Sequence, residues 1–394
     1  MAGLLPVLDA QQRLIALGTR VESETVALSA AADRWAANDI VARRSQPATD
    51  LSAMDGYAIR FADMPGPFTL IGESAAGHGF AGAVSAGEAV RIFTGAAMPA
   101  GADTVLVQEE ASRDGNCVIL TGEGPPALAR NVRKAGLDFS EGDMLVGRGD
   151  RLTPARIALA AIAGYGLIGV NRRVRIAILT TGDELVPPGA PISPNQVPEA
   201  NGVMLAAHLA DLPVDVTLLP ILPDRLDEIT AAIATIEADI IVTIGGASVG
   251  DHDLIRPAIE AAGGSIDFWR IALRPGKPML AGRIGGAVIL GLPGNPVSAF
   301  VTAHLFLRPL IAAHGGARDP YPQTITVTLG AALPANDQRQ DYLRAQWENG
   351  RVIAATKQDS SLLKTLAGAA CLIVRAPFAP AAKPGDIVDI LPLA

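Results

Sequence analysis

The chain is poor in aromatic residues and has no run of Lys and Arg. Aromatics make up 4% of the 394 residues, too few for the stacking platforms that bind single-stranded nucleic acid. The formal net charge is −8, which argues against nucleic acid or an anionic membrane as the main partner. The basic side chains are therefore expected to act locally, within a site.

Cysteine is also scarce. The two cysteines, Cys117 and Cys371, lie far apart in apolar sequence. This pattern differs from zinc sites, redox CxxC motifs and disulfide frameworks, so we expect two core thiols. The five histidines accompany no serine or cysteine nucleophile motif, and we assign them no catalytic role.

Long apolar runs and a secretory leader are missing too. The longest apolar stretch, 157–170, contains three glycines and is shorter than the ~20 residues of a membrane span. The first residues, MAGLLPVLDAQQRLIALG, lack a basic leader and a small-residue cleavage site. We expect a cytoplasmic protein with no membrane partner.

The sequence changes character several times. Hydrophobic residues form 49% of the chain, and its length suggests roughly two to four domains. Residues near 5–40 have helical spacing. Residues 50–135 are rich in turns between short apolar runs, which predicts a small all-β unit. A helix is predicted over 153–169, with Thr153 as its N-cap and Pro154 at its first position.

From Val174 apolar strands alternate with helices. The strands VRIAILTTG, VDVTLLPIL and DIIVTIGG enclose two helical stretches, which predicts a parallel sheet covered on both faces. Short β-like runs return from Tyr321, so we expect a multidomain α/β plus β chain. The expected parts are a linking domain, helical and extended (1–22 with 42–49 and 137–173), a small β domain (23–41 with 50–136), a central parallel α/β domain (174–320) and a C-terminal β-barrel-like domain (321–394).

Three Gly-rich turns follow apolar strands, within 174–185, 239–253 and 285–300. Ligands of α/β sheets bind beyond the carboxyl ends of parallel strands, so these turns predict one shared site. RPGKP supplies Arg274 and Lys277, which could hold phosphate or another oxyanion. Acids and bases on neighbouring strand ends predict a metal-bridged anion. The acids of the first two turns are Asp183, Glu184, Asp251 and Asp253.

The sequences of six motifs, and their order along the chain, resemble those of the molybdopterin molybdenumtransferases, the family of MoeA and the gephyrin E domain. The resemblance covers essentially the whole chain. It implies that molybdate is inserted into adenylated molybdopterin, with a divalent cation, and that molybdenum cofactor and AMP are released. The motifs are SAMDGYA (52–58), FTGAAMPAGADTVLVQEE (93–110), TTGDEL (180–185), GGASVGDHD (245–253), RPGKP (274–278) and GLPGNPVS (291–298).

The resemblance makes Asp224 and Asp253 the Mg²⁺ ligands, with Glu184 nearby. Local sequence alone favours Asp224 as the N-cap of the helix that follows it. Asp183 and Asp251 fit both a turn beside glycine and a supporting role at the site. An adenylated pterin carries a pyrophosphate, which these carboxylates would repel unless Mg²⁺ lay between them.

The resemblance places molybdate beside Arg274 and Lys277, with Arg339 and Ser360 added from the last domain. Ser361 fits the pattern as well as Ser360, and Arg339 also fits an exposed hairpin. A tetrahedral dianion calls for cations and hydroxyls with little competing negative charge. We expect several relatives to have lysine where this chain has Arg270 and Arg274. Arginine would bind the oxyanion through a fork of N–H donors, whereas lysine would bind it as a point charge.

The third turn leads into a helix with Asn295 as its N-cap, whose free N–H groups can bind an anion. The same turn also fits a purely structural need for Gly294 and Pro293. The remaining residues expected to bind substrate are Thr181, Gly182, Gly245, Gly246, Ser248, Gly250, Arg270, Pro278, Pro296 and Ser298.

The resemblance further implies that Asp55 and Thr94 act at the site of a partner subunit, in a homodimer. Taken alone, Asp55 is typical of a turn and Thr94 of a strand end. Further partners implied are the adenylyltransferase that makes the substrate and the molybdoenzymes that accept the product.

Two alternatives remain. The α/β segment alone also resembles the molybdopterin adenylyltransferases, but the flanking β domains oppose that function. A gephyrin-like scaffold that binds without turnover is disfavoured because the chain has no long linker and keeps acids at 184, 224 and 253.

Overall fold

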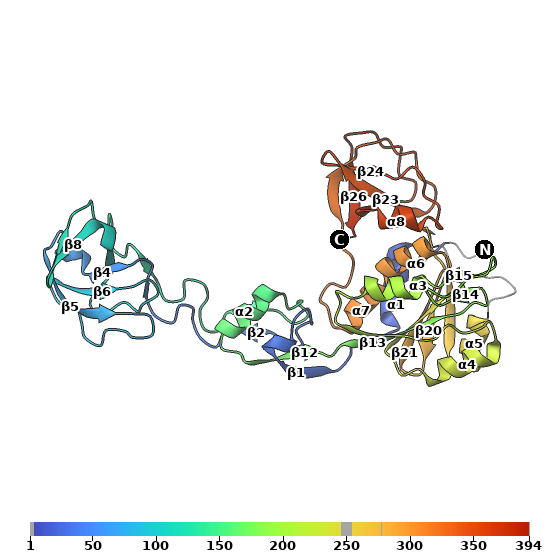
Figure 1. Cartoon of the computed structure of the whole chain (residues 1–394), viewed down its shortest axis with the longest axis horizontal. Coiled ribbons are helices and arrows are strands. Elements are labelled where there is room, and N and C mark those ends of the chain that lie inside the picture. Colours follow the sequence, from blue (N-terminus) through green and yellow to red (C-terminus); the bar gives the residue numbers. More distant parts are fainter. Residues whose placement is uncertain (1–3, 246–253, 277, 394) are drawn as a thin grey trace.

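The computed structural model describes residues 4–245, 254–276 and 278–393, without the side chains at 267–269 and 278. The chain is drawn out into three groups of elements (Figure 1). A β-sheet lies at one end and a small unit around one helix lies in the middle. The α/β sheet and the C-terminal sheet lie together at the other end.

A six-stranded sheet forms the isolated end. Apolar side chains alternate between its faces, so Tyr57 and Ile59 pack with Phe68, whereas Ala58 and Val90 pack in a second cluster. Cys117 is only half-buried here, so the prediction of a core thiol is wrong for this residue. The strand order is β7 (Thr104–Val107), β4 (Gly56–Ile59), β6 (Glu88–Ile92), β5 (Phe68–Ser74), β9 (Cys117–Leu120) and β8 (Ala111–Asp114), and the 3-10 turns Phe61–Asp63 and Gln108–Glu110 adjoin it.

The middle unit is built around α2 (Pro154–Ile162). The Thr153 side chain accepts a hydrogen bond from the Arg156 N–H at 3.4 Å, which confirms the predicted N-cap. The helix ends before 169 because Gly164 has a positive φ of 101°. Its short strands pair as β1 (Ser23–Ala27) with β12 (Leu167–Asn171) and β2 (Ile40–Val41) with β11 (Met144–Val146). The pair of β3 (Leu51–Ser52) and β10 (Val132–Arg133) belongs to the isolated sheet unit instead, where Leu51 bridges Ala97 and Val132 packs against the Val90 cluster.

These pairings correct two expected domain limits. Residues 23–41 belong with the middle unit and not with the small β domain, because β1 and β2 pair with β12 and β11. Residues 1–22 contribute α1 (Val7–Ala16), which packs in the α/β core and not in the linking unit. The helical spacing near 5–40 is misleading beyond Ala16, where the chain continues as β1 and a 3-10 turn at Leu28–Ala30.

The α/β part has the predicted parallel sheet, with helices on both faces. The helices α1, α3 (Asn201–His208), α6 (Pro296–Thr302) and α7 (Arg308–His314) pack in the core of one face, and α4 (Leu226–Thr235) and α5 (Ile255–Ala261) in that of the other. The strand order is β16 (Val214–Leu218), β13 (Val174–Thr180), β17 (Ile240–Ile244), β21 (Ala287–Leu292), β20 (Pro278–Ile284) and β18 (Ser265–Arg270), the last two antiparallel to their neighbours.

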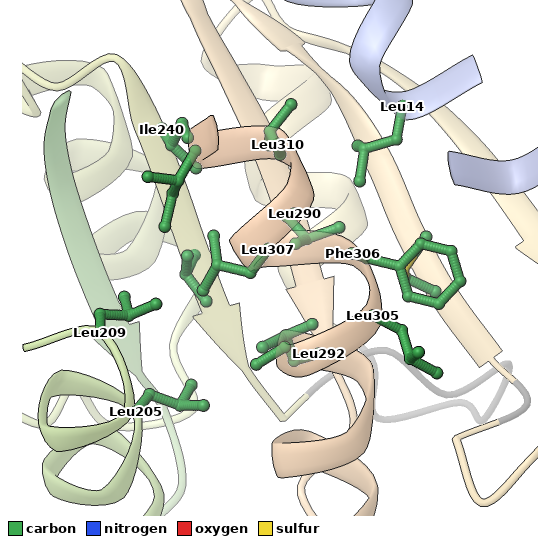
Figure 2. Close-up of a cluster of buried hydrophobic side chains, with 14 of the residues drawn as sticks. Leu14, Leu205, Leu209, Ile240, Leu290, Leu292, Leu305, Phe306, Leu307 and Leu310 are labelled. Carbon is green, nitrogen blue, oxygen red and sulfur yellow. The ribbon is translucent and has the colours of Figure 1, made fainter. Parts of the chain in front are cut away.

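The larger core of this domain surrounds one long helix, shown in Figure 2. A π-helical turn at Ala303–Leu307 joins α6 to α7, so that Phe306 and Leu310 meet Leu14 of α1 and Leu290 of the sheet. Among the described residues, the combined helix Pro296–His314 is long and apolar enough to cross a membrane, with a mean hydropathy of 1.4. Protein covers 67% of its apolar window, as expected for a core helix.

The C-terminal sheet includes a short strand that precedes the central domain's β20 in sequence. The short strand β19 (Leu273–Arg274) pairs in parallel with β23 (Gln340–Glu348), which places Arg274 at the junction. Cys371 is fully buried, and burial raises its pKa to about 11, so the core-thiol prediction is confirmed for this residue. The other elements are β22 (Ile325–Thr328), β24 (Arg351–Ala354), α8 (Leu363–Ala367), β25 (Cys371–Arg375) and β26 (Ile387–Pro392).

Candidate active site

A pocket of about 280 Å³ opens at the carboxyl edge of the parallel sheet, beyond the ends of β13 and β17. Ligands of parallel α/β sheets bind at this edge. Five residues expected from the sequence line it: Thr181, Glu184, Gly245, Gly294 and Pro296. The wall also includes Leu185 of the TTGDEL motif, and the β15 strand (Val197–Pro198), Glu199, Ala200 and Asn201, which the sequence analysis had not indicated as site residues.

Backbone hydrogen bonds join the turn after β13 to the loop that follows β16. The Leu222 N–H donates to the Thr180 carbonyl at 3.0 Å, and the Gly182 N–H donates to the Leu222 carbonyl at 3.2 Å. The Asp224 N–H then donates to Asp183 Oδ1 at 3.2 Å. Two acids distant in sequence therefore lie side by side.

Glu184 completes this group of carboxylates. Its side chain folds back over Gly182, where a Cβ would lie 2.8 Å from a Glu184 oxygen. Gly182 also has a φ of 153°, so the turn depends on glycine for both space and conformation. The carboxylates of Asp183, Glu184 and Asp224 thus share one end of the sheet.

The adjacent base, Arg225, offsets the charge of this group only in part, through Asp183. Burial, and then the charges of Asp183 and Glu184, raise the pKa of Asp224 above its usual value. Arg225, the next residue, instead donates to Glu228 at 2.8 Å. Arg225 is also the N-cap residue of α4, so the interpretation of Asp224 as a helix cap is wrong.

The donor chemistry fits a hard divalent cation. Clustered carboxylate oxygens are the protein ligands that Mg²⁺ prefers, and the charges of Asp183 and Glu184 that help raise the pKa of Asp224 are ones that a cation would offset. Within the described residues no group of three His, Cys, Asp or Glu side chains is arranged to hold a metal by itself. Asp253, the third expected ligand, lies outside the described residues.

The third turn closes the other side of the pocket. The Gly245 N–H donates to the Leu292 carbonyl at 3.2 Å, and the Asn201 amide donates to the Gly294 carbonyl at 2.7 Å. Asn295 is the N-cap residue of α6, as predicted, but its side chain makes no capping hydrogen bond. The Val297 N–H is taken by the Ser360 carbonyl at 3.2 Å, so the expected row of free helix N–H groups is partly occupied.

Glu199 and Asn201 are the functional candidates that the sequence analysis missed. The β14 strand (Leu185–Val186) pairs with β15 and carries Glu199 to the pocket. Glu199 is 8% exposed, and its Oε1 accepts the Gly202 N–H at 2.7 Å at the start of α3. A Glu three residues before Gly202, ahead of a helical stretch, was the available signal for this capping role.

A second charged group lies at the junction with the C-terminal sheet. Arg274 Nε donates to Asp341 Oδ1 at 2.8 Å, and its terminal nitrogen lies 2.9 Å from Asp337 Oδ2. Arg339 donates to the same Asp337 oxygen at 3.1 Å. The structure thus brings the two predicted arginines together. The expectation of little competing negative charge is wrong, because the carboxylates of Asp337 and Asp341 already pair with these arginines.

Ser360 and Ser361 have different surroundings. The Ser361 hydroxyl donates to Asp359 Oδ1 at 2.6 Å, whereas the Ser360 hydroxyl has no partner among the described residues. Ser360 is also fixed through its carbonyl to the start of α6, as described above. Ser298 is 4% exposed and does not line the pocket, which argues against the predicted contact with substrate.

Asp55 and Thr94 lie together in the isolated sheet. Asp55 Oδ1 accepts the Thr94 N–H at 2.7 Å and the Thr94 hydroxyl at 2.8 Å. These hydrogen bonds lower the pKa of Asp55 and keep it ionised. Within one chain this sheet is far from the pocket, at the opposite end of the molecule (Figure 1).

Comparisons with known proteins match this arrangement over the whole chain. Three family descriptions match in order: the MoeA N-terminal region (domain I and II) over residues 5–164, a probable molybdopterin binding domain over 177–313, and the MoeA C-terminal region (domain IV) over 326–393. A molybdopterin molybdenumtransferase of Haemophilus influenzae is 35% identical, with 94% of each chain covered. The chain belongs to the MoeA family of molybdopterin molybdenumtransferases.

Other relatives of the family agree. Molybdopterin molybdenumtransferase 2 of Mycobacterium tuberculosis is 34% identical over 88% of this chain and 89% of its own length. A crystal structure of the molybdopterin biosynthesis MoeA protein from Pyrococcus horikoshii OT3 is 25% identical, with a TM-score of 0.84 over 99% of this chain and all of that one. The multidomain fold expected from the sequence is therefore that of the MoeA family.

The remaining residues expected from the family pattern lie partly at the edge of the sheet and partly outside the described residues. Arg270 ends β18 and is paired in register with Pro278 at the start of β20, at the same edge of the sheet as the pocket. Pro293 follows β21 directly. Outside the described residues lie Gly246, Ser248, Gly250, Asp251, Asp253 and Lys277.

Proposed function

We propose that this chain is an enzyme of molybdenum cofactor biosynthesis. It would take molybdenum from molybdate, insert it into adenylated molybdopterin and release AMP. The observation that carries the proposal is the pocket at the carboxyl edge of the sheet, which Glu184 lines and beside which Asp183, Glu184 and Asp224 lie together. Relatives named molybdopterin molybdenumtransferase, similar over nearly the whole chain, support it.

The carboxylates would hold Mg²⁺, through Asp224 and Asp253 with Glu184 nearby. When bound, Mg²⁺ would offset the charge of the pyrophosphate link and of the departing AMP. Without it, Asp224 and its neighbours would repel the substrate, because like charges at short range raise the free energy of the complex.

The other residues would position the substrates. Glu199 Oε1 caps α3 and fixes the wall against which the pterin would lie, and Asn201 ties that wall to the third turn. Arg274 and Arg339 would hold molybdate at the junction with the C-terminal sheet, with the Ser360 hydroxyl beside the start of α6. The two sulfur atoms of the pterin supply the ligands for molybdenum, so no cysteine of this chain is needed.

The active unit would be a homodimer that shares its sites. Asp55 and Thr94 lie far from the pocket of their own chain, so they would serve the pocket of the partner (Figure 1). The protein would act in the cytoplasm, between an adenylyltransferase that makes its substrate and the molybdoenzymes that receive the product.

The first test follows AMP release from adenylated molybdopterin, with molybdate and Mg²⁺. We expect molybdate-dependent AMP release, and a loss of at least about a hundredfold in Asp224→Asn, because a metal ligand stabilises several kcal/mol of developing charge. Asp227→Asn is the matched control, since Asp227 lies exposed in the first turn of α4. Binding without release would favour a scaffold, and adenylation of molybdopterin with ATP would favour an adenylyltransferase.

The shared site is tested by mixing two inactive variants, Asp55→Asn and Asp224→Asn. In a mixed dimer one site carries both substitutions and the other carries neither. Random mixing should therefore restore about a quarter of the wild-type activity. If both residues acted within one chain, every chain would keep one defect and the mixture would stay inactive.

A further inference from the structure

The loop that carries Arg339 also carries an acid that binds both predicted oxyanion ligands. Oδ2 of Asp337 lies 2.9 Å from a terminal nitrogen of Arg274 and 3.1 Å from one of Arg339. A single oxygen between two guanidinium groups is the position that an oxygen of a tetrahedral dianion would take. The site therefore already contains an anion of its own.

The four charged side chains of this group differ in how firmly they are held. Asp341 is 10% exposed and receives the Nε of Arg274, so this pair fixes the arginine. Asp337 is 47% exposed, and Arg274 is 42% exposed. Exposed ion pairs contribute little to stability because water and salt screen them. The Asp337 pairs can therefore be broken while the Arg274–Asp341 pair persists.

The turn at Asp337 forms through its backbone neighbours and does not depend on the two ion pairs with the arginines. Its Oδ1 accepts the Arg339 backbone N–H at 2.9 Å, which closes a short turn. The amide of the preceding residue, Asn336, donates to the carbonyls of Arg339, Arg375 and Ala376. An asparagine at 337 can make the same turn, because its amide oxygen accepts the same hydrogen bond.

We propose that Asp337 is an internal competitor that an incoming oxyanion must displace from Arg274 and Arg339. With Asp337 in place, the two arginines and two aspartates carry no net charge, so a free dianion is only weakly attracted. Once Asp337 is displaced, both forks are released towards one ligand, while Asp341 still holds Arg274. Asp337 thus sets the concentration of oxyanion at which the site fills. This inference rests on the proposed oxyanion site.

The test is calorimetric titration of the full-length protein with sodium molybdate, without pterin. Neutralising a charged side chain of a binding site usually weakens binding. Asp337→Asn should instead tighten molybdate binding, by roughly two- to tenfold in Kd, because two exposed ion pairs no longer compete with the ligand. Asp389→Asn is the control for net charge: Asp389 is an exposed residue of β26 in the same sheet. It should leave the Kd unchanged. Asp337→Ser, which also keeps a turn acceptor, should tighten binding as well.

Arg339→Gln separates this inference from the proposed function. If the wild type binds molybdate, Arg339→Gln weakens binding and both Asp337 variants bind as the wild type does or less tightly, the competitor is disproved and the oxyanion site stands. If neither the wild type nor the Asp337 variants bind molybdate, both the site and the competitor are disproved. Tighter binding in Asp337→Asn that Asp389→Asn reproduces would also overturn the inference, because net charge alone would explain it.

Discussion

Aspartates at the two ends of the α/β sheet have opposite surroundings, and their pKa values are shifted in opposite directions. At the amino end, Asp239 accepts two hydrogen bonds from Arg172, at 2.7 and 2.8 Å, and others from the backbone and side chain of Arg175. Burial by itself would raise the pKa of Asp239, but these bonds outweigh it and the pKa is lowered. At the carboxyl end, Asp224 faces other carboxylates and its pKa is raised.

This contrast separates an acid that is paired within the structure from one that we propose to be functional. Both ends have cavities, and the one beside Asp239 is the larger, at about 600 Å³ against 280 Å³. Cavity size alone would therefore point away from the proposed site. Of the two ends, as far as the described residues go, the carboxyl end leaves Asp183, Glu184 and Asp224 close together, a cost to stability that an external cation can reduce.

The largest effect on stability is expected at the amino end. Asp239→Asn leaves Arg172 with only the exposed Glu22 as an ionic partner, so we expect the free energy of unfolding to fall by about 2 kcal/mol. The value lies below that of a fully buried pair because Arg172 is 26% exposed. Denaturant titration measures it. Asp215→Asn removes the exposed partner of Arg173 and should change the free energy by under about 0.5 kcal/mol.

The same pair of proteins gives a pH test. The folded-state pKa of Asp239 is lowered, so its stabilisation is fully present above the unfolded value of about 3.9 and is lost as the pH falls through the folded value. The difference between wild type and Asp239→Asn should be full at pH 7 and shrink below about pH 4. A difference that stays constant down to pH 3 would mean that the charge of Asp239 is not what stabilises this end.

The pattern of the sequence was sufficient for the sheet but not for the domain limits. Strands such as 174–180 and 240–244 could be predicted because each is a mainly apolar run that is followed by Gly or Thr-Gly. The placement of 23–41 could not, because its partners for pairing, β12 and β11, lie more than a hundred residues away. Local composition does not encode a pairing over that distance.

The site shows the same limit. Glu184 and Asp224 could be identified as acids near the ends of strands, and only the resemblance to the family suggested them as metal ligands, a role that stays a prediction. The competing acid Asp337 was not, because its role depends on β19 pairing with β23, which carries Arg274 to the loop of the C-terminal sheet. Glu199 was missed because a short two-stranded ribbon, and not a long element, brings it to the pocket.

The smallest change in the free energy of unfolding is expected at the carboxyl end, where it should have the opposite sign. Asp224→Asn removes one of three neighbouring negative charges, so without metal it should raise the free energy of unfolding by roughly a few tenths of a kcal/mol at pH 7; the effect is small because Asp224 is exposed to solvent. Thermal melting of both proteins measures the sign. Asp227→Asn, whose charge lies outside this group, should show no such gain.

Added Mg²⁺ should reverse that order. A cation at ten times its Kd stabilises the folded wild type by about 1.4 kcal/mol, whereas the variant, which lacks a ligand, should gain much less. Mg²⁺ would then raise the melting temperature of the wild type above that of Asp224→Asn. If Mg²⁺ shifted both proteins equally, the carboxylates at this end would not be its binding site. The clustered carboxylates that distinguish the surroundings of Asp224 from those of Asp239 would then have to bind a cation other than Mg²⁺.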